Sequence, residues 1–145
     1  MSLASPPPYN ALIRRCIDLQ RLCQHAARNV SEPGLRVVLQ ETAAALELLV
    51  IDLQTQAAAS GRRPASRGRW SGPLQRRLTS LWMHGAPLRD DQWIRLLARR
   101  EAAVLQLFEQ TVGAATPDNA PTLRRLLPQL QAVHLDMHSL AAAAR

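Results

Sequence analysis

The chain lacks the features that would place it in a membrane or a secretory pathway. Its most apolar stretch, residues 43–51, contains Glu47 and is followed by Asp52, so no apolar run is long enough to cross a bilayer. The first ten residues have neither the basic start nor the apolar run of a secretory signal. We therefore expect a cytoplasmic protein without membrane insertion.

Cysteines and conventional catalytic signatures are also scarce. The two cysteines, Cys16 and Cys23, are seven residues apart in a helical pattern, hence about 10 Å apart and too distant to form a disulfide. The sequence has no Gly-rich phosphate loop, nucleophile elbow, Cys-x-x-Cys or His-Glu-x-x-His motif. It also has no run of alternating β-branched and polar residues that would predict a strand. These absences favour an all-α protein that is not an enzyme.

Four apolar stripes, each with alternating steps of four and three residues, predict four packed helices. The first stripe consists of Leu12, Cys16, Leu19, Cys23, Ala26 and Val30, and the second of Leu35, Leu39, Thr42, Leu46, Leu49 and Leu53. The third consists of Ile94, Ala98, Glu101, Leu105, Phe108 and Val112, and the fourth of Leu123, Leu127, Leu130, His134, Met137 and Ala141. Two of these positions, Glu101 and His134, place polar residues where the pattern requires core side chains.

The stripes set the expected boundaries of a single domain, residues 1–145. Helices are expected over residues 10–30, 33–59, 90–113 and 119–143, with Asn10 capping the first and Asp90 or Asp91 the third. Pro128 should kink or break the last helix. Short links make two antiparallel hairpins, and residues 60–89 connect them, with one short helix near 73–83. A connection this long favours a ferritin-like four-helix bundle with a basic crossover, although a plain up-and-down bundle remains open.

A ferritin-like bundle with a dimetal centre requires metal-binding residues near the middle of each helix. A dimetal centre takes a Glu from each of two helices and a Glu-x-x-His pair from each of the other two. The candidates here are Asp18, Glu47, Glu101 and His134, which predict at most one iron or manganese ion because Val50 and Gln131 occupy ligand positions.

The alternative interpretation is structural. Glu101 and His134 could bind one another in the core and leave no metal site. His134 and His138 also have the i, i+4 spacing of metal ligands.

The net charge of +7 comes from the connection between the hairpins. All 18 basic residues are arginine, and seven of them lie between Leu53 and Arg89, where there is no acid. Together with Trp70, Trp82 and Trp93, four of these arginines could bind nucleic acid or another anionic surface: Arg62, Arg63, Arg76 and Arg77. The alternative is that the tryptophans anchor the connection and the arginines are solvated or paired with acids.

Several short segments between about Tyr9 and Leu140 match the sequence pattern of a known protein family. They are Cys16-Ile17-Asp18, Ala26-Ala27, the stretch from Gly61 to Trp70, Leu74-Gln75-Arg76, Arg100-Glu101 and His134. In their order and spacing they resemble a bacterial family of ferritin-like four-helix domains of unknown function. The resemblance implies a ferritin-like fold and no established activity. Because half of the dimetal ligands and all conventional catalytic motifs are missing, we expect a non-catalytic interaction or stress-associated protein that binds a protein partner or self-associates, with a dimer as the favoured homo-oligomer.

Overall fold

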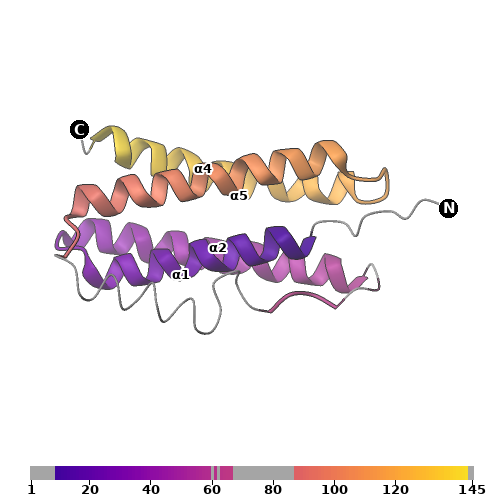
Figure 1. Cartoon of the computed structure of the whole chain (residues 1–145), viewed down its shortest axis with the longest axis horizontal. Helices are drawn as coiled ribbons and strands as arrows, with labels where there is room; N and C mark the ends of the chain where they lie inside the picture. Colours follow the sequence, from indigo (N-terminus) through magenta and orange to yellow (C-terminus); the bar gives the residue numbers. More distant parts are fainter. Residues whose placement is uncertain (1–8, 60, 62, 67–86, 144–145) are drawn as a thin grey trace.

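Four α-helices make up nearly all of the part of the chain that the structure describes. The structure is a computed structural model, and it describes residues 9–59, 61, 63–66 and 87–143. The helices are α1 (Tyr9–Asn29), α2 (Pro33–Ala59), α4 (Asp90–Ala114) and α5 (Ala120–Ala143), and these residues contain no strand (Figure 1). The all-α, four-helix prediction is confirmed. The short helix expected near 73–83 lies outside the described residues.

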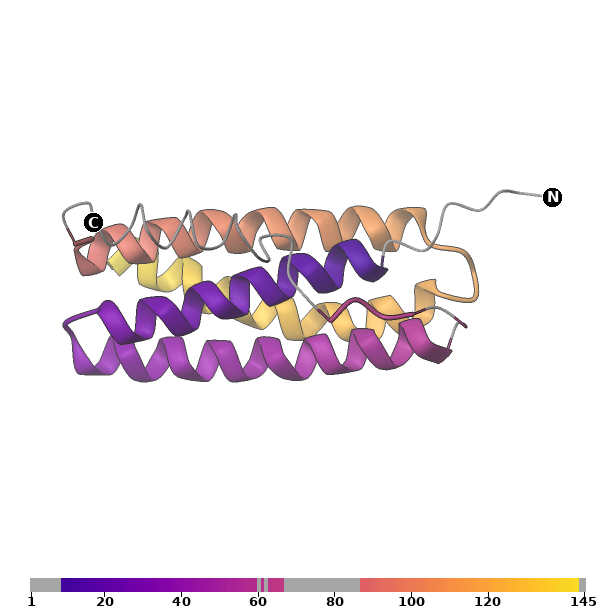
Figure 2. The same cartoon turned by 60° about the horizontal axis from the view of Figure 1, so that its bottom comes forward.

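The helices pack as two antiparallel hairpins side by side (Figures 1 and 2). Helix α1 contacts α2 and α4, and α5 contacts α4 and α2. The Tyr9 hydroxyl at the start of α1 donates a hydrogen bond to Asn119 Oδ1 in the α4–α5 turn, at 3.3 Å. The start of α4 lies beside the α1–α2 turn, so α2 ends at the opposite end of the bundle from the point where α4 begins. No helix in the described ranges is long and apolar enough to span a membrane.

The α1–α2 turn is held by two carboxylates. Glu32 caps α2, because its carboxylate accepts hydrogen bonds from the backbone N–H groups of Gly34 (2.9 Å) and Leu35 (2.6 Å). Pro33 then occupies the first helical position, where its missing N–H leaves no bond unmade. Asp90 reaches across from α4 and accepts bonds from the backbone N–H of Ser31 (2.8 Å) and of Glu32 (3.0 Å). Asp90 therefore ties the second hairpin to the first.

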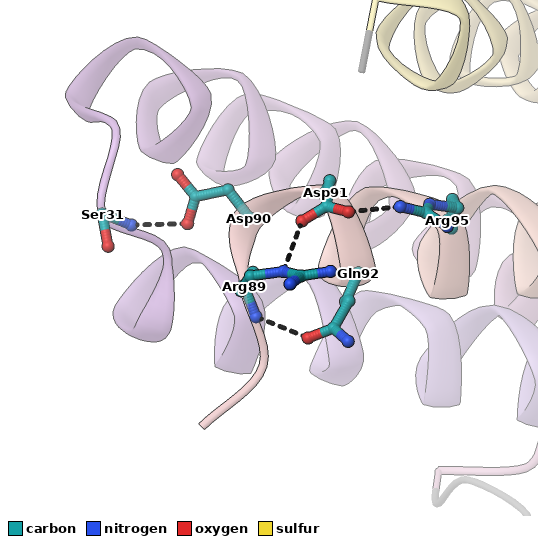
Figure 3. Close-up of polar contacts among 6 residues, drawn as sticks. All are labelled: Ser31, Arg89, Asp90, Asp91, Gln92 and Arg95. Carbon is teal, nitrogen blue, oxygen red and sulfur yellow. Dashed lines mark hydrogen bonds and ion pairs between the residues drawn. The ribbon is translucent and has the colours of Figure 1, made fainter. Parts of the chain in front are cut away.

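The prediction that Asp90 or Asp91 caps α4 is wrong, because the N-cap residue is Arg89 and both acids lie inside the helix. The backbone N–H of Arg89 donates to Gln92 Oε1 at 2.8 Å, so Gln92 closes the first turn (Figure 3). Asp90 points to Ser31, while Asp91 pairs with the side chains of Arg89 and Arg95. Both acids still lie in the first turn, where the helix dipole favours negative charge.

Asn10 does not cap α1 either, because it lies within the helix and binds a returning segment of the chain. Its amide donates to the carbonyl of Arg63 (3.2 Å) and accepts from the N–H of Ala65 (2.8 Å). The carbonyl of Ala65 accepts a third bond from Gln54 Nε2 on α2, at 3.0 Å. Residues 63–65 are therefore held against both helices of the first hairpin.

The core follows the predicted stripes in the first hairpin and departs from them in the second. Every predicted stripe residue of α1 and α2 is buried, including Thr42, whose hydroxyl donates to the carbonyl of Val38 at 2.8 Å. In α4 the stripe residues Ile94, Glu101 and Phe108 are buried as predicted, but the alternate positions are shifted by one. There Leu97, Val104 and Thr111 replace Ala98, Leu105 and Val112. In α5, Leu123, Leu130 and Met137 are buried as predicted, whereas Leu126 and Val133 replace Leu127 and His134. Helix α5 continues through Pro128 without a break.

Candidate functional site

Glu101 and His134 meet between the middle of α4 and the middle of α5. The Glu101 side chain is only 1% exposed, and its Oε2 is hydrogen-bonded to Nδ1 of His134. His134 lies beside the core column of α5, and its side chain is 33% exposed. The two residues therefore bind one another, as the structural interpretation of the sequence predicted, but His134 lies at the edge of the core and not inside it.

The Glu101 carboxyl lies in an unfavourable environment for a charge. Burial raises its pKa above the ordinary value of 4.5, while the hydrogen bond and charge of His134 act in the opposite direction. Glu101 Oε1 is buried and has no hydrogen-bond partner among the described residues. A buried polar atom left without a partner costs about 1–3 kcal/mol. The unpartnered Oε1 therefore offsets the stabilisation that the hydrogen bond of Oε2 to His134 provides.

The charge of Glu101 also affects the thiol of Cys23 on α1. Burial raises the pKa of Cys23 to about 12, and the negative charge of Glu101 adds to the effect. Burial alone raises the pKa of Cys16 to about 12. Because the thiolate is the nucleophile and the metal ligand, both cysteines are unreactive in the folded protein.

A second histidine lies one turn further along α5. The rings of His134 and His138 have centroids 6.1 Å apart and planes inclined by 19°. His138 is exposed, whereas His134 is held by Glu101. One imidazole of this pair is therefore fixed and the other can turn.

The four residues predicted to ring a metal ion do not converge. Glu47 is exposed on α2, and Asp18 is half-buried on α1. Within the described ranges, no three His, Cys, Asp or Glu side chains are grouped closely enough to hold a metal. Of the four predicted ligands, the structure brings only Glu101 and His134 together.

The predicted anion site is only partly covered by the structure. Arg63 is exposed, and its carbonyl accepts the bond from Asn10. Three of its arginines and two of its tryptophans lie outside the described residues: Arg62, Arg76, Arg77, Trp70 and Trp82. Trp93 is 3% exposed and packs edge-on against His25, with ring centroids 5.6 Å apart. It is therefore a core residue, and its ring is covered too fully to stack on a nucleobase.

Helix α2 carries a feature that the sequence reasoning missed. Three large aliphatic side chains on its outer face are exposed: Val37 (51%), Leu48 (63%) and Ile51 (49%). Ala44 between them is exposed as well. We call these four residues the α2 outer stripe. Their spacing of seven, four and three residues is a second heptad pattern, and this signal was present in the sequence.

Comparison with known proteins gives no relative. No family model matches the chain, and neither a curated protein nor a solved structure is significantly similar to it. The resemblance to bacterial ferritin-like domains therefore remains a prediction.

Proposed function

We propose that the protein is a ferritin-like four-helix bundle that functions by binding a protein surface, and that this surface is a second copy of itself. The observation that carries the proposal is the α2 outer stripe. A helix in a bundle needs one apolar face, directed to the core, and α2 has two. Several large apolar side chains exposed on one face of a helix are typical of an interaction surface.

The ferritin-like part of the proposal draws on the positions of the helix ends. Helix α2 ends far from where α4 begins, next to the α1–α2 turn. A connection between these points has to run the length of the bundle, as in ferritin-like topology. The bonds of Asn10 and Gln54 to residues 63–65 support this, because they hold the beginning of the connection against the first hairpin.

The energetics favour a reversible contact. Full burial of an aliphatic side chain is worth about 1.5–3 kcal/mol, and Val37, Leu48 and Ile51 are each roughly half exposed. Covering them therefore yields about 3 kcal/mol, and about twice that in a two-fold dimer, where the same patch is buried on both copies. Association itself costs roughly 4–15 kcal/mol, so other contacts must contribute and the dimer should dissociate on dilution.

Sedimentation velocity over a wide range of protein concentration tests the proposal, with a matched pair of variants. Leu48 and Leu135 are almost equally exposed, at 63% and 65%, but Leu135 lies on α5. The wild type and Leu135→Glu should shift from monomer to dimer as concentration rises, whereas Leu48→Glu should remain monomeric. A wild type that stays monomeric throughout, or equal dissociation of both variants, contradicts self-association through α2.

A further inference from the structure

The two histidines of α5 lie close together on a helix that takes no part in the proposed self-association through α2. We infer that His134 and His138 bind one divalent transition-metal ion at the surface of α5, with both imidazoles as ligands and Glu101 as the residue that positions His134. The candidate ion is Cu²⁺, with Ni²⁺ and Zn²⁺ binding more weakly. This site differs from the core centre predicted from the sequence, because Glu101 does not touch the ion and neither Asp18 nor Glu47 takes part.

The geometry of the pair suits a single ion. Residues four apart on a helix lie one above the other on the same face, and these rings are nearly parallel, with centroids 6.1 Å apart. Metal–nitrogen bonds are about 2.0–2.1 Å long, so the two rings must come somewhat closer to share an ion. His138 can make this adjustment because its side chain is exposed. Water completes the coordination.

Glu101 supplies the support that metal-binding histidines require. Such a histidine usually donates its second ring N–H to a carboxylate, which fixes the orientation of the ring and raises its basicity. When the Glu101 carboxylate accepts the Nδ1–H of His134, the lone pair of the ring lies on Nε2, which can bind an ion. The carboxylate is itself fixed, since its side chain is 1% exposed in the packed middle of α4. His134 is therefore pre-oriented, and only His138 has to be ordered on binding.

The choice of metal follows from the donor atoms. Two neutral imidazoles suit copper, nickel and zinc, whereas magnesium and calcium require oxygen ligands. Cu²⁺ binds most tightly among divalent first-row ions in the Irving–Williams order. The thiol of Cys23 does not compete as a ligand, because it is buried and protonated.

Titration of the purified full chain with Cu²⁺ alone, followed by electron paramagnetic resonance, tests the site. The wild type should bind one tight equivalent with hyperfine coupling to two imidazole nitrogens. His138→Asn should lose one nitrogen coupling and at least tenfold in affinity, and its exposed position spares the fold. His25→Asn, which alters a histidine packed against Trp93 on the α1–α4 side, should bind as the wild type does.

The Glu101→Gln variant tests whether Glu101 positions His134 without binding the ion itself. It should keep both nitrogen couplings and lose about 10–100-fold in affinity, the usual loss when such a supporting group is removed. Circular dichroism of each variant checks that the helices persist. Wild-type affinity in His138→Asn, or an equal loss in His25→Asn, overturns the site. Unchanged affinity in Glu101→Gln overturns the role of Glu101. The monomeric Leu48→Glu variant should still bind Cu²⁺, so failure of this inference and failure of self-association can be told apart.

Discussion

Replacing Glu101 and replacing His134 should change the free energy of unfolding by different amounts. Glu101→Leu removes the hydrogen bond to His134, worth about 1.5–3 kcal/mol, but also removes a partnerless buried oxygen that costs about 1–3 kcal/mol. Because His134 is one-third exposed, water can replace its lost partner. We expect Glu101→Leu to change the free energy of unfolding by no more than about 1 kcal/mol.

His134→Leu should be more damaging, because it leaves a buried carboxyl with neither oxygen partnered. Breaking a buried pair from one side costs about 3–5 kcal/mol. Uptake of a proton by Glu101 limits the cost, so we expect a loss of about 2–3 kcal/mol at neutral pH. For a chain of this size the loss corresponds to a fall of roughly 6–10 °C in melting temperature. The double variant should resemble Glu101→Leu, since it no longer contains the carboxyl.

The way in which the free energy of unfolding depends on pH provides a second test of the Glu101–His134 pair. Burial raises the pKa of Glu101 in the folded state above its unfolded value near 4.5, so the folded protein holds this proton more tightly. The stability linked to that proton is fully present below about pH 4.5 and is lost as pH rises through the folded pKa. His134→Leu removes the group that opposes the shift. Its destabilisation should therefore be largest at neutral pH and shrink as pH falls toward 4.5.

Urea unfolding followed by far-ultraviolet circular dichroism, at several pH values, measures these differences. All variants should unfold with the same dependence on urea, which confirms that the compactness of the native and unfolded states is unchanged. The reasoning is refuted if Glu101→Leu destabilises the protein as much as His134→Leu does. In that case the hydrogen bond to His134 stabilises the fold by more than the buried, partnerless oxygen of Glu101 destabilises it.

Two further predictions concern the α1–α2 turn and the thiols. Asp90→Ala removes two hydrogen bonds to the backbone of Ser31 and Glu32 and should lower the free energy of unfolding by about 1–2 kcal/mol. Asp91→Ala, which breaks only surface ion pairs, should cause a smaller loss in the same urea titration. Because burial raises the pKa of both Cys16 and Cys23 to about 12, iodoacetamide should label them only as fast as the protein unfolds. Rapid labelling of the folded protein at mildly alkaline pH would contradict this burial.

The sequence predicts the four helices well, and the reason for its errors is local. In α1 and α2 the predicted stripe residues are buried, and apolar neighbours such as Ile13, Ile17 and Val50 widen the buried face beside them. Helix α4 has two adjacent apolar columns, and the pattern cannot choose between Leu97 with Val104 and Ala98 with Leu105. Packing decides in favour of the column that begins with the large ring of Trp93. A one-residue shift turns a helix by about 100°, and in α5 the same kind of shift moves His134 to the edge of the core.

The candidate site shows the same limit. Depth along a helix can be counted from the sequence, and on this basis Glu101 and His134 were expected to meet, as they do. Glu47 has a suitable depth but follows the core residue Leu46, which places it about 100° around the helix and in solvent. Direction around each axis, and not depth, decides which polar residues converge. For Glu47 the α2 stripe already gives this direction, whereas in α4 and α5 it depends on which of two adjacent apolar columns packs into the core.

The two departures from what folding requires are the basis for assigning function. A bundle is stabilised by apolar residues inside and polar residues outside. Apart from the exposed Leu135 on α5, the described residues depart from this rule mainly in two places. The chain exposes Val37, Leu48 and Ile51 on α2, and it buries Glu101 in α4. Features that cost stability without helping the fold are expected at functional positions. The first lowers solubility unless another surface covers it, and the second leaves a core oxygen unpaired while it holds a partly exposed imidazole in place. Association through α2 and ligation at α5 give each departure a use that folding alone does not provide.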